Sequence, residues 1–477
     1  MIRFGTGGWR DIIGENFTFD NVRRFSQGVA EQIIQQGKKG QGVVIGYDNR
    51  FMAEEFSKSA AEVFAGNNIK VILLTPSVPT PLVNFVTKEK NAAAGLTFTA
   101  SHNPHIYNGI KYVCEGGLPA TEEVTSNLEK SINNIPIEDI KKLSYKKSLS
   151  TKLITRRSYT DEFINFIESQ LDMDLIKESS IKVLYDPMFG TGVNALLTLL
   201  VDTRSNVKII HDEVDPLFGG RVPAPTESTL WRLMAMMKEG DYDLGIATDG
   251  DGDRIAIIDE EGNYVDANEI LTILYYYFLE YKKEKGNVVR NISTTHLLDE
   301  IAVSYGHQCY EKPVGFKHIA EGMLETKAIL GGESSGGITI RGHLLEKDAI
   351  LSAGILLEML AHTKMSLRTI REEIVSKFGK RFFKEYSYTY EADDKEFIES
   401  IITKVKAEEI YKDELLNYKT YDGVKWEWQD GTWCLVRFSG TEPLLRIMVE
   451  SPRKQEIDSI IQNVISIIEN KVLLNNP

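Results

Sequence analysis

The 477-residue sequence lacks the features that mark secreted and membrane proteins. It has only three cysteines, Cys114, Cys309 and Cys434, an odd number spread far apart along the chain. They fit neither a disulfide framework nor a clustered zinc site, so the predicted compartment is the reducing cytoplasm. The first residues contain no apolar signal-peptide core, and the longest apolar stretch, at residues 270–281, is too short to span a bilayer. We therefore expect no association with membranes.

Positive charge is also scarce. Lys and Arg total 55 against 69 Asp and Glu, which gives a formal net charge of −14. Such a surface argues against binding to nucleic acid, so a phosphate-bearing ligand must meet a local basic pocket. Hydrophobic residues make up 42% of the chain and charged residues 26%. This balance is typical of a folded globular protein and excludes wholesale disorder.

Apolar runs and helical segments alternate in the order strand, helix, strand, strand, and this order recurs three times. The last strand of each round ends in polar residues, which include Ser101, Asp249 and Glu333. Ligands of open α/β sheets bind beyond the carboxyl ends of strands, so we expect these three loops to face one cleft. The order thus predicts a degenerate threefold repeat. The expected strands lie at 43–48, 71–75 and 92–100, then 181–186, 207–212 and 243–249, and then 287–293, 310–316 and 328–337.

The chain beyond residue 382 follows a different pattern of strand, helix, strands and helix. The last helix carries one apolar stripe, made of Ile457, Ile460, Ile461, Val464, Ile465 and Ile468. We therefore predict three related α/β domains with mixed sheets and a smaller C-terminal α+β domain. The expected boundaries fall in polar stretches and give domains at 1–150, 151–265, 266–380 and 381–477.

The densest chemical motif is TDGDGDR, at residues 248–254. It places Asp249, Asp251 and Asp253 at alternate positions, with glycines that permit a tight turn between them. Carboxylates so close repel one another unless a divalent cation neutralises them, so the motif favours a metal site over a solvated acidic turn. A calcium loop of the EF-hand type does not fit, because Arg254 stands where that loop needs glycine and the flanking segments are expected strands.

The motif TASHNP, at residues 99–104, follows an expected strand and offers Ser101 and His102. Taken alone, a serine at this place is a turn former as readily as a nucleophile, since no G-x-S-x-G elbow surrounds it. With a metal loop in the same cleft, Ser101 becomes a candidate phosphoryl carrier. Lys111 lies a short way along the chain and is either part of this site or a surface lysine.

The motif RFSGTEPLLR, at residues 437–446, combines arginines, hydroxyls and a glycine turn. These groups suit a phosphate dianion, although the arginines can also pair with acids such as Glu442 or Glu450. The candidate ligands are Arg437, Ser439, Gly440, Thr441 and Arg446.

Two weaker motifs complete the set of candidate loops. GGESSGG, at residues 331–337, offers Glu333 and Ser335 to sugar hydroxyls, though a flexible turn has the same composition. VGFKHI supplies Lys317 and His318, which are candidates for proton transfer or phosphate binding and have structural alternatives as well.

In this order, FGTGGWR, TASHNP, DGDGDR, GGESSGG and RFSGTEPLLR resemble the motifs of the α-D-phosphohexomutase family over the full chain. The resemblance implies four domains around a central cleft and the interconversion of a hexose 1-phosphate and a hexose 6-phosphate. The reaction would pass through a phosphoserine and a hexose 1,6-bisphosphate, which also serves as activator, with one Mg²⁺ per active site. A small-molecule hexose phosphate is the expected partner, and the expected assembly is a monomer or dimer.

The resemblance also implies a role for each candidate residue. Ser101 would be the phosphoserine and would share Mg²⁺ with Asp249, Asp251 and Asp253. Glu333 and Ser335 would contact the sugar, and the residues of the RFSGTEPLLR loop would bind the phosphate that is not transferred. The residues expected to line the reaction centre are Arg10, His102, Lys111, Arg254 and Lys317, with His318 as a further proton-transfer candidate.

Two departures from the family pattern bear on the sugar. Gly337 stands where some dual-specificity members carry histidine, which blurs glucose against mannose. Residues 7–10, GGWR, differ from the D-G-V-R-G start of aminosugar enzymes, which favours glucose over glucosamine. We expect a phosphoglucomutase, with a phosphomannomutase or phosphoglucosamine mutase as alternatives within the family and a metal-dependent sugar phosphatase as the alternative in another class.

Overall fold

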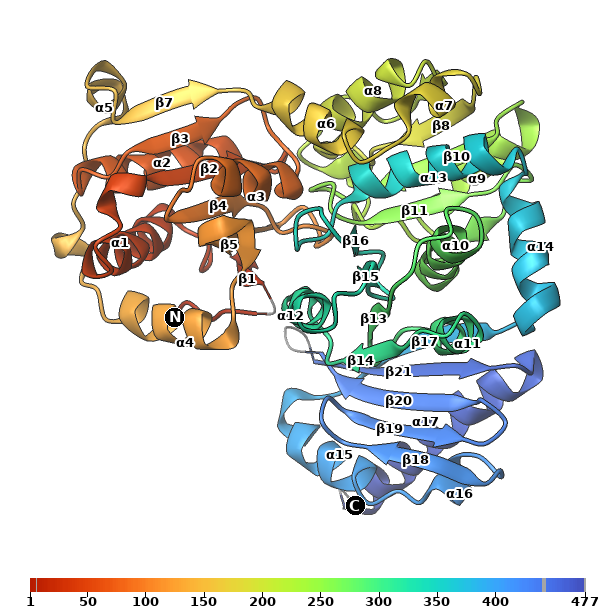
Figure 1. Ribbon diagram of the computed structural model, residues 1–477. Coiled ribbons are helices and arrows are strands. Elements are labelled where there is room, and N and C mark those ends of the chain that lie inside the picture. The colour runs from red at the N-terminus through yellow and green to blue at the C-terminus, as the bar shows by residue number, and fades with distance from the viewer. Residues whose placement is uncertain (6, 440–442, 476–477) are drawn as a thin grey trace.

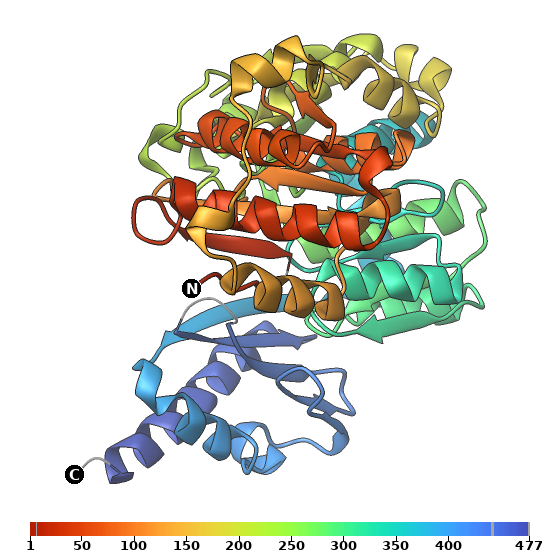
Figure 2. The same ribbon diagram turned by 90° about the vertical axis from the view of Figure 1, so that its left-hand side faces the viewer.

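The computed structural model describes residues 1–5, 7–439 and 443–475. Within these residues, four β-sheets follow one another along the chain, and each forms the centre of one unit (Figure 1). The first three units lie together, while the fourth lies at one side of the third, next to β13 and β14 (Figures 1 and 2).

The first unit has a mixed sheet in the order β1-β5-β4-β2-β3-β7, with β6 paired to β5. The strand β7 pairs in parallel with β3, so this unit continues past the expected boundary at residue 150. Its elements are β1 (Gly8–Ile12), α1 (Phe19–Gln35), β2 (Val43–Tyr47), α2 (Ala53–Gly66), β3 (Val71–Leu74), α3 (Thr80–Glu89), β4 (Ala94–Phe98), β5 (Tyr107–Cys114), β6 (Leu118–Pro119), α4 (Glu122–Asn133), α5 (Tyr145–Ser150) and β7 (Ile154–Arg157).

The second and third units are smaller sheets with helices packed against them, in the orders β12-β11-β10-β8-β9 and β14-β13-β15-β16. The second comprises α6 (Thr160–Glu168), α7 (Met173–Lys177), β8 (Lys182–Asp186), α8 (Gly192–Asp202), β9 (Asn206–Ile209), α9 (Trp231–Glu239), β10 (Leu244–Thr248), β11 (Ile255–Ile258) and β12 (Tyr264–Val265). The third comprises α10 (Ala267–Glu280), β13 (Val288–Asn291), α11 (Leu297–Ser304), β14 (Cys309–Lys312), α12 (Phe316–Thr326), β15 (Leu330–Gly332), β16 (Ile338–Ile340), α13 (Ala349–Thr363) and α14 (Leu367–Phe378).

One strand order is common to the first three sheets. It reads β5-β4-β2-β3 in the first, β11-β10-β8-β9 in the second and β16-β15-β13-β14 in the third. Among these four strands of each sheet, three are parallel to one another and the fourth returns antiparallel. The threefold repeat expected from the sequence is therefore present. Ser101, Asp249 and Glu333 follow the equivalent strands β4, β10 and β15.

The fourth unit is an antiparallel sheet in the order β17-β21-β20-β19-β18. The expected apolar stripe of α17 is buried, from Ile457 to Ile468, because this helix packs on β17 and β21. The elements are β17 (Phe382–Thr389), α15 (Lys395–Ile402), α16 (Ala407–Ile410), β18 (Leu415–Lys419), β19 (Val424–Trp428), β20 (Trp433–Phe438), β21 (Leu444–Ser451) and α17 (Lys454–Asn475).

The hydrophobic core divides the molecule differently from the sheets. One continuous cluster joins α3 of the first unit, β8 and α8 of the second, and α10 and α13 of the third. The fourth unit has a separate core between its sheet and α17. A small cluster containing Ile292 and Trp433 connects it to the third unit. The first three units are thus packed as one body, to which the fourth is attached.

The helices of the described residues include no single one that is long and apolar enough to cross a membrane. The bent pair α13 and α14 satisfies that length and composition only when the two helices are taken together.

The first strand is held so close to β5 that one glycine has no room for a side chain. A Cβ atom on Gly8 would lie 2.2 Å from the carbonyl oxygen of Ile110, whereas a Cβ on Gly7 would have nothing within 4 Å. We expect Gly8→Ala to destabilise the first unit by about 1–3 kcal/mol, because β1 must move away from β5. Gly7→Ala is the matched control and should change stability by less than about 0.5 kcal/mol. Scanning calorimetry of both variants measures this, and equal Tm values would contradict the expectation.

Candidate active site

Ser101 lies where the first and second units meet. Its hydroxyl donates a hydrogen bond of 2.9 Å to Asp249 Oδ2, and both side chains are buried. The two loops touch through their backbones as well, since a Cβ atom on Gly250 would lie 2.8 Å from the carbonyl oxygen of Ser101. A glycine is therefore required at position 250, and the DGDGDR turn brings the serine directly against the first carboxylate.

The three aspartates form one buried cluster. Asp249, Asp251 and Asp253 are fully buried, and each offers a carboxylate oxygen within 4.8 Å of the other two. Oδ1 of Asp251 and Oδ1 of Asp253 are buried and accept no hydrogen bond from any described residue. Burial, together with repulsion from the other two carboxylates, raises the pKa of Asp249 well above its usual value. Orphaned oxygens and crowded negative charge fit a divalent cation, which binds such oxygens and removes the repulsion.

Two lysines and a threonine surround this cluster. Lys111 Nζ lies 2.6 Å from Asp251 Oδ2 and 2.5 Å from Asp253 Oδ2. Lys347 Nζ lies 3.4 Å from Asp253 Oδ2. The hydroxyl of Thr80, at the start of α3, donates to Asp251 Oδ2. The first and third units thus both supply groups that contact the aspartate loop of the second unit.

The ionisation of Lys111 differs from what a general base needs. Burial lowers its pKa, but the carboxylates of Asp251 and Asp253 outweigh that effect, so the net pKa is raised. Lys111 is therefore a charged partner of the aspartates in this arrangement. A base needs a lowered pKa near neutrality to accept a proton from a sugar hydroxyl.

His102 lies next to Ser101 and close to two arginines, Arg10 and Arg254. Arg10 Nη1 donates to Asn103 Oδ1 at 2.7 Å, which attaches β1 to the serine loop. The positive charge of Arg254, followed by burial and the charge of Arg10, holds the pKa of His102 well below its usual value. The His102 ring is therefore neutral, and its buried Nδ1 has no hydrogen-bond partner among the described residues.

The glycine-rich loop after β15 adjoins the aspartate loop. Ile255 N donates to the carbonyl oxygen of Gly336 at 3.2 Å, and Arg254 forms a β-bridge with Gly337. Glu333 is buried, and its Oε1 accepts hydrogen bonds from Gly315 N at 2.8 Å and Asn291 Nδ2 at 3.3 Å. Ser335 is exposed.

Lys347 fills the space above Gly337. A Cβ atom on Gly337 would lie 2.2 Å from Lys347 Cδ, so a side chain at this position has no room while the lysine keeps its place. The lysine stem also packs near Phe316, with Nζ 5.6 Å from the ring centroid. At position 337, where some dual-specificity members of the family carry histidine, this chain has a glycine covered by a lysine.

Lys317 and His318 lie on α12, away from the contacts described so far. Lys317 Nζ is 3.4 Å from Glu122 Oε2 of the first unit, and His318 Nδ1 is 3.4 Å from Glu321 Oε2. In the described part of the chain, no hydrogen bond or ion pair joins either side chain to Ser101 or to the aspartates. The structure thus brings Arg10, His102, Lys111 and Arg254 near the serine, whereas Lys317 pairs with Glu122 at the start of α4 and His318 pairs within α12.

The arginine-flanked loop belongs to the fourth unit. Arg437 on β20 and Arg446 on β21 are directly opposite each other in the sheet. Arg437 Nε donates to Asp422 Oδ1 at 2.6 Å, and Arg446 pairs with Glu385. Ser439 N donates to the carbonyl oxygen of Leu444 at 2.8 Å. The remaining predicted ligands, Gly440 and Thr441, and the alternative partner Glu442 lie outside the described residues.

The expected alternative partner Glu450 does not pair with either arginine. Its Oε1 accepts hydrogen bonds from Trp433 Nε1 at 2.9 Å and from His296 N at 3.0 Å, so it links the fourth unit to the third.

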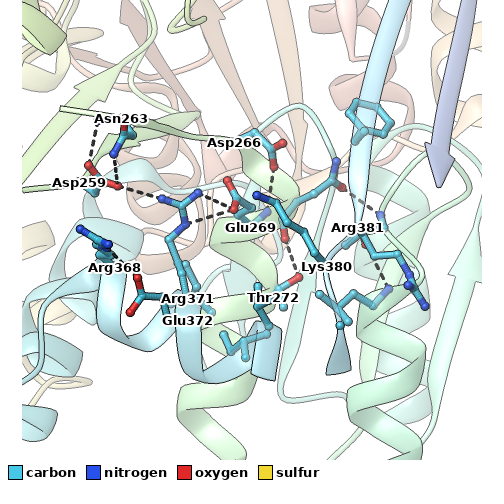
Figure 3. Close-up of a pocket in the computed structure, with 18 of the residues that line it drawn as sticks. Asp259, Asn263, Asp266, Glu269, Thr272, Arg368, Arg371, Glu372, Lys380 and Arg381 are labelled. Atoms are coloured by element: carbon cyan, nitrogen blue, oxygen red, sulfur yellow. Dashed lines mark hydrogen bonds and ion pairs between the residues drawn. The ribbon is translucent and has the colours of Figure 1, made fainter. Parts of the chain in front are cut away.

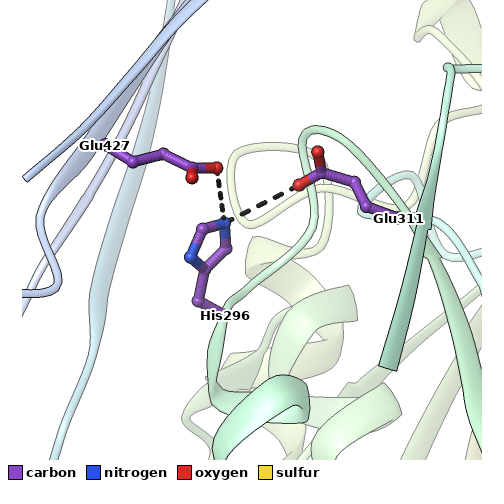
Figure 4. Close-up of side chains that lie close together, drawn as sticks. All are labelled: His296, Glu311 and Glu427. Atoms are coloured by element: carbon purple, nitrogen blue, oxygen red, sulfur yellow. Dashed lines mark ion pairs between the residues drawn. The ribbon is translucent and has the colours of Figure 1, made fainter. Parts of the chain in front are cut away.

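A second cluster of possible metal ligands lies between the third and fourth units, where His296, Glu311 and Glu427 point toward one another (Figure 4). Lys425 Nζ sits among them, 2.8 Å from His296 Nε2, 3.1 Å from Glu311 Oε2 and 3.3 Å from Glu427 Oε1. Lys419 Nζ also lies 2.8 Å from Glu311 Oε1 and 2.7 Å from Glu427 Oε1, so two ammonium groups balance the two carboxylates. The cluster is therefore an ionic contact between units.

A cavity of about 490 Å³ lies between α10, α14 and the start of β17 (Figure 3). Arg371 crosses one side of it and pairs with Asp259 and Glu269. None of the described site residues predicted from the sequence lines this cavity. The chemistry suggested by the motifs is therefore located elsewhere, around Ser101.

Thr80 and Lys347 both reach the aspartates and were not predicted from the sequence. Thr80 carried no signal beyond a Pro-Thr-Pro at a helix start. Lys347 directly precedes Asp348, which caps α13 by accepting hydrogen bonds from Ile350 N and Leu351 N. Recognising that cap places Lys347 in a loop beside β16, and this was the one available signal.

Comparison with known proteins agrees with this geometry over the whole chain. Models of the phosphoglucomutase/phosphomannomutase alpha/beta/alpha domains I, II and III match residues 1–138, 161–262 and 266–378, and the model of the C-terminal domain matches 393–467. A "Probable phosphoglucosamine mutase" of Methanosphaera stadtmanae is 31% identical over 466 residues, covering 96% of both chains. A "Phosphoglucomutase/phosphomannomutase" of Thermococcus kodakarensis is 27% identical over 466 residues, covering 98% of both.

A solved structure gives the same result. The crystal structure of a "putative phosphomannomutase" from Thermus thermophilus superposes with a TM-score of 0.84 and 28% identity, covering 98% of this chain and 99% of that one. These matches confirm the four-domain fold, the mutase activity and the isomerase class expected from the sequence. The chain therefore belongs to the phosphoglucomutase/phosphomannomutase family and is a phosphohexomutase.

Proposed function

We propose that this phosphohexomutase moves a phosphoryl group between Ser101 and the two ends of a hexose phosphate. The observation that carries the proposal is the 2.9 Å hydrogen bond between the Ser101 hydroxyl and Asp249, within a buried cluster of three carboxylates. In the forward direction, phospho-Ser101 gives its group to a sugar hydroxyl, which forms a hexose 1,6-bisphosphate. The bisphosphate turns around and returns its other phosphate to the serine, and added bisphosphate activates the enzyme by loading that serine.

Mg²⁺ is the proposed cofactor. The residues that would hold it are Asp249, Asp251 and Asp253, together with the oxygen of Ser101 or its phosphate. When bound, it would neutralise charge on the transferring phosphoryl group. The protein contributes a buried setting in which charged groups interact more strongly than in water.

Proton transfer to and from the sugar hydroxyl falls to groups that border the serine and the aspartates. Lys347 is the first candidate, because its Nζ lies 3.4 Å from Asp253 Oδ2, farther than Lys111 Nζ lies from either aspartate, and beside the loop that carries Glu333. His102 is the second, since its buried Nδ1 lies on the serine loop without a hydrogen-bond partner among the described residues. Lys317, the lysine favoured by the resemblance, reaches Glu122 instead.

The two ends of the substrate are proposed to be held by different units. Glu333 of the third unit contacts sugar hydroxyls, with Ser335 exposed nearby. The two arginines of the fourth unit, Arg437 and Arg446, bind the phosphate that is not transferred. Because the fourth unit has its own core, it can change its position relative to the first three and accept the bisphosphate in both orientations.

The proposal also extends to the identity of the sugar. Glucosamine 1-phosphate is our first candidate, because the 31% identical relative of Methanosphaera stadtmanae is named a phosphoglucosamine mutase. Glucose 1-phosphate is the second, because residues 7–10 differ from the start expected of aminosugar enzymes. The relative of Thermococcus kodakarensis, named for glucose and mannose phosphates, keeps mannose 1-phosphate in the set.

Removing the serine hydroxyl tests the central claim. We expect Ser101→Ala to lower kcat by about 10³-fold or more, since no acceptor for the phosphoryl group remains. Ser57→Ala, at a buried serine on α2, is the control and should keep normal turnover. Coupled assays and mass spectrometry of the fragment containing residue 101 provide the readout. Normal turnover by Ser101→Ala would refute the mechanism, and steady release of inorganic phosphate by the native enzyme would indicate a phosphatase.

Sugar preference is measured by kcat/KM for glucosamine, glucose and mannose 1-phosphates under one set of conditions. We expect kcat/KM for glucosamine 1-phosphate to exceed the other two values by about tenfold or more, because a site that binds the amino group of the sugar loses that interaction with glucose or mannose. A higher kcat/KM for glucose 1-phosphate would overturn the order of candidates and leave the mutase mechanism intact.

Replacement of Lys347 and replacement of Lys317 are expected to affect kcat to different extents. Lys347→Met should lower kcat by about 10²-fold, the typical contribution of a positioned acid or base. Lys317→Met should lower kcat much less, because Lys317 pairs with an exposed glutamate. Lys130→Met, on the exposed face of α4, is the control for removal of a positive charge. A larger loss of kcat in Lys317→Met than in Lys347→Met would reverse the assignment.

A further inference from the structure

Arg50 lies directly beneath the loop that carries Ser101. It follows β2 in the first unit, and its side chain is completely buried. Its guanidinium donates to four backbone carbonyls of that loop, those of Ser101, Asn103, Pro104 and Tyr107, at 2.6, 2.7, 2.9 and 3.0 Å. A single planar group therefore holds the loop on both sides of its turn, a task for which the fixed fork of arginine is suited and lysine is not.

Asp48 completes the support from below. Its Oδ2 accepts hydrogen bonds from Arg50 Nε at 3.1 Å and from Thr99 Oγ1 at 2.6 Å. The same Thr99 oxygen accepts a hydrogen bond of 2.8 Å from Ser101 N. Both backbone groups of Ser101 are thus fixed through one buried carboxylate, the amide by way of Thr99 and the carbonyl by way of Arg50.

The second unit closes this arrangement from the other side. The Phe218 ring is buried, and its centroid lies 5.0 Å from the Arg50 guanidinium carbon. Asn49 Nδ2 donates to the carbonyl oxygen of Phe189 at 2.8 Å, so the residue next to Arg50 also binds the second unit. The guanidinium is therefore shielded from water, which strengthens its hydrogen bonds.

Ser101 itself needs such support. Its φ is +53°, in the left-handed region that a serine adopts only when its surroundings impose it. In this conformation its hydroxyl reaches Asp249 Oδ2. A phosphorylated serine has no hydroxyl proton for that bond, so the hydrogen bonds that then hold its conformation are those of the backbone.

We infer that Arg50 is a positioning residue for phosphoryl transfer, acting through the backbone of Ser101 without touching the substrate. The inference rests on the proposed role of Ser101. In the transfer step, the bond between phosphorus and the serine oxygen breaks as a bond to the sugar oxygen forms, and the sugar proton passes to the enzyme's base. Arg50 keeps the serine oxygen aligned with the phosphorus and the sugar oxygen during this transfer.

The test is the pair Arg50→Lys and Arg371→Lys in the full-length enzyme. Lysine keeps the charge opposite Asp48 but cannot reach four carbonyls, so we expect Arg50→Lys to lower kcat by about 10²-fold, the cost of a small misplacement of reacting atoms. The KM for the hexose phosphate should stay within about threefold, because the substrate contacts are intact. Arg371 also pairs with a buried aspartate, but at the cavity of Figure 3, and its lysine variant should keep normal kcat.

Loading of the serine gives a second readout. Dephosphorylated enzyme is mixed with glucose 1,6-bisphosphate, and phosphate on residue 101 is followed by mass spectrometry. We expect Arg50→Lys to load about 10²-fold more slowly than the native enzyme. A purely structural role would lower Tm without changing this rate or kcat.

Thr99→Val keeps the experiment decisive if Arg50→Lys does not fold. It removes only the hydroxyl between Asp48 and Ser101 N, and a loss of about tenfold in kcat at unchanged KM is expected. Unchanged kcat and loading in the folded variants would overturn the inference. Absence of mutase turnover and of phosphate on residue 101 in the native enzyme would instead overturn the proposed function, so the two failures are distinguishable.

Discussion

Three buried carboxylates set the electrostatic constraint on which the rest of the site depends. Their oxygens lie within 4.8 Å of one another, and burial, together with repulsion from the other two carboxylates, raises the pKa of Asp249. Positive groups gather around them from two other units, Lys111 from the first and Lys347 from the third. The cluster therefore draws three units together, because none of these units balances the charge alone.

The threefold repeat explains how the loops come to meet. In each of the first three sheets, the chain leaves the third parallel strand, makes a polar turn and returns antiparallel. Loops at this place lie at the carboxyl ends of strands, where ligands of open α/β sheets bind. One inherited turn position is thus used for a serine, a set of aspartates and a glutamate. A continuous core through α3, α8 and α13 then fixes the relative positions of the three turns.

The sequence predicted those parts of the site that lie within one loop. The spacing in DGDGDR indicated the aspartate cluster, and the strand before it indicated its position, because both depend on neighbours in the chain. The sequence did not predict roles for Lys347, Thr80 and Arg50, because those roles come from packing between segments far apart in the chain. The same holds for β7, which joins the first sheet from beyond residue 150. The partners of the arginines, Asp422 and Glu385, were also unpredictable, since they lie on other strands or turns of the fourth unit.

One turn of the third unit relates the two proposed ends of the substrate. Val314 N donates to Asp422 Oδ2 at 2.6 Å, and Asp422 Oδ1 accepts from Arg437. The next amide, Gly315 N, donates to Glu333 at 2.8 Å. Two neighbouring peptide groups thus bind Asp422, which pairs with the arginine proposed to bind phosphate, and Glu333, which is proposed to contact the sugar. Because the fourth unit has a separate core, its position depends on its contacts with the third unit, namely this turn, the ionic cluster around Lys425, the link from Glu450 to His296 and the small cluster containing Ile292 and Trp433. A change in any of these contacts alters the distance between Glu333 and Arg437.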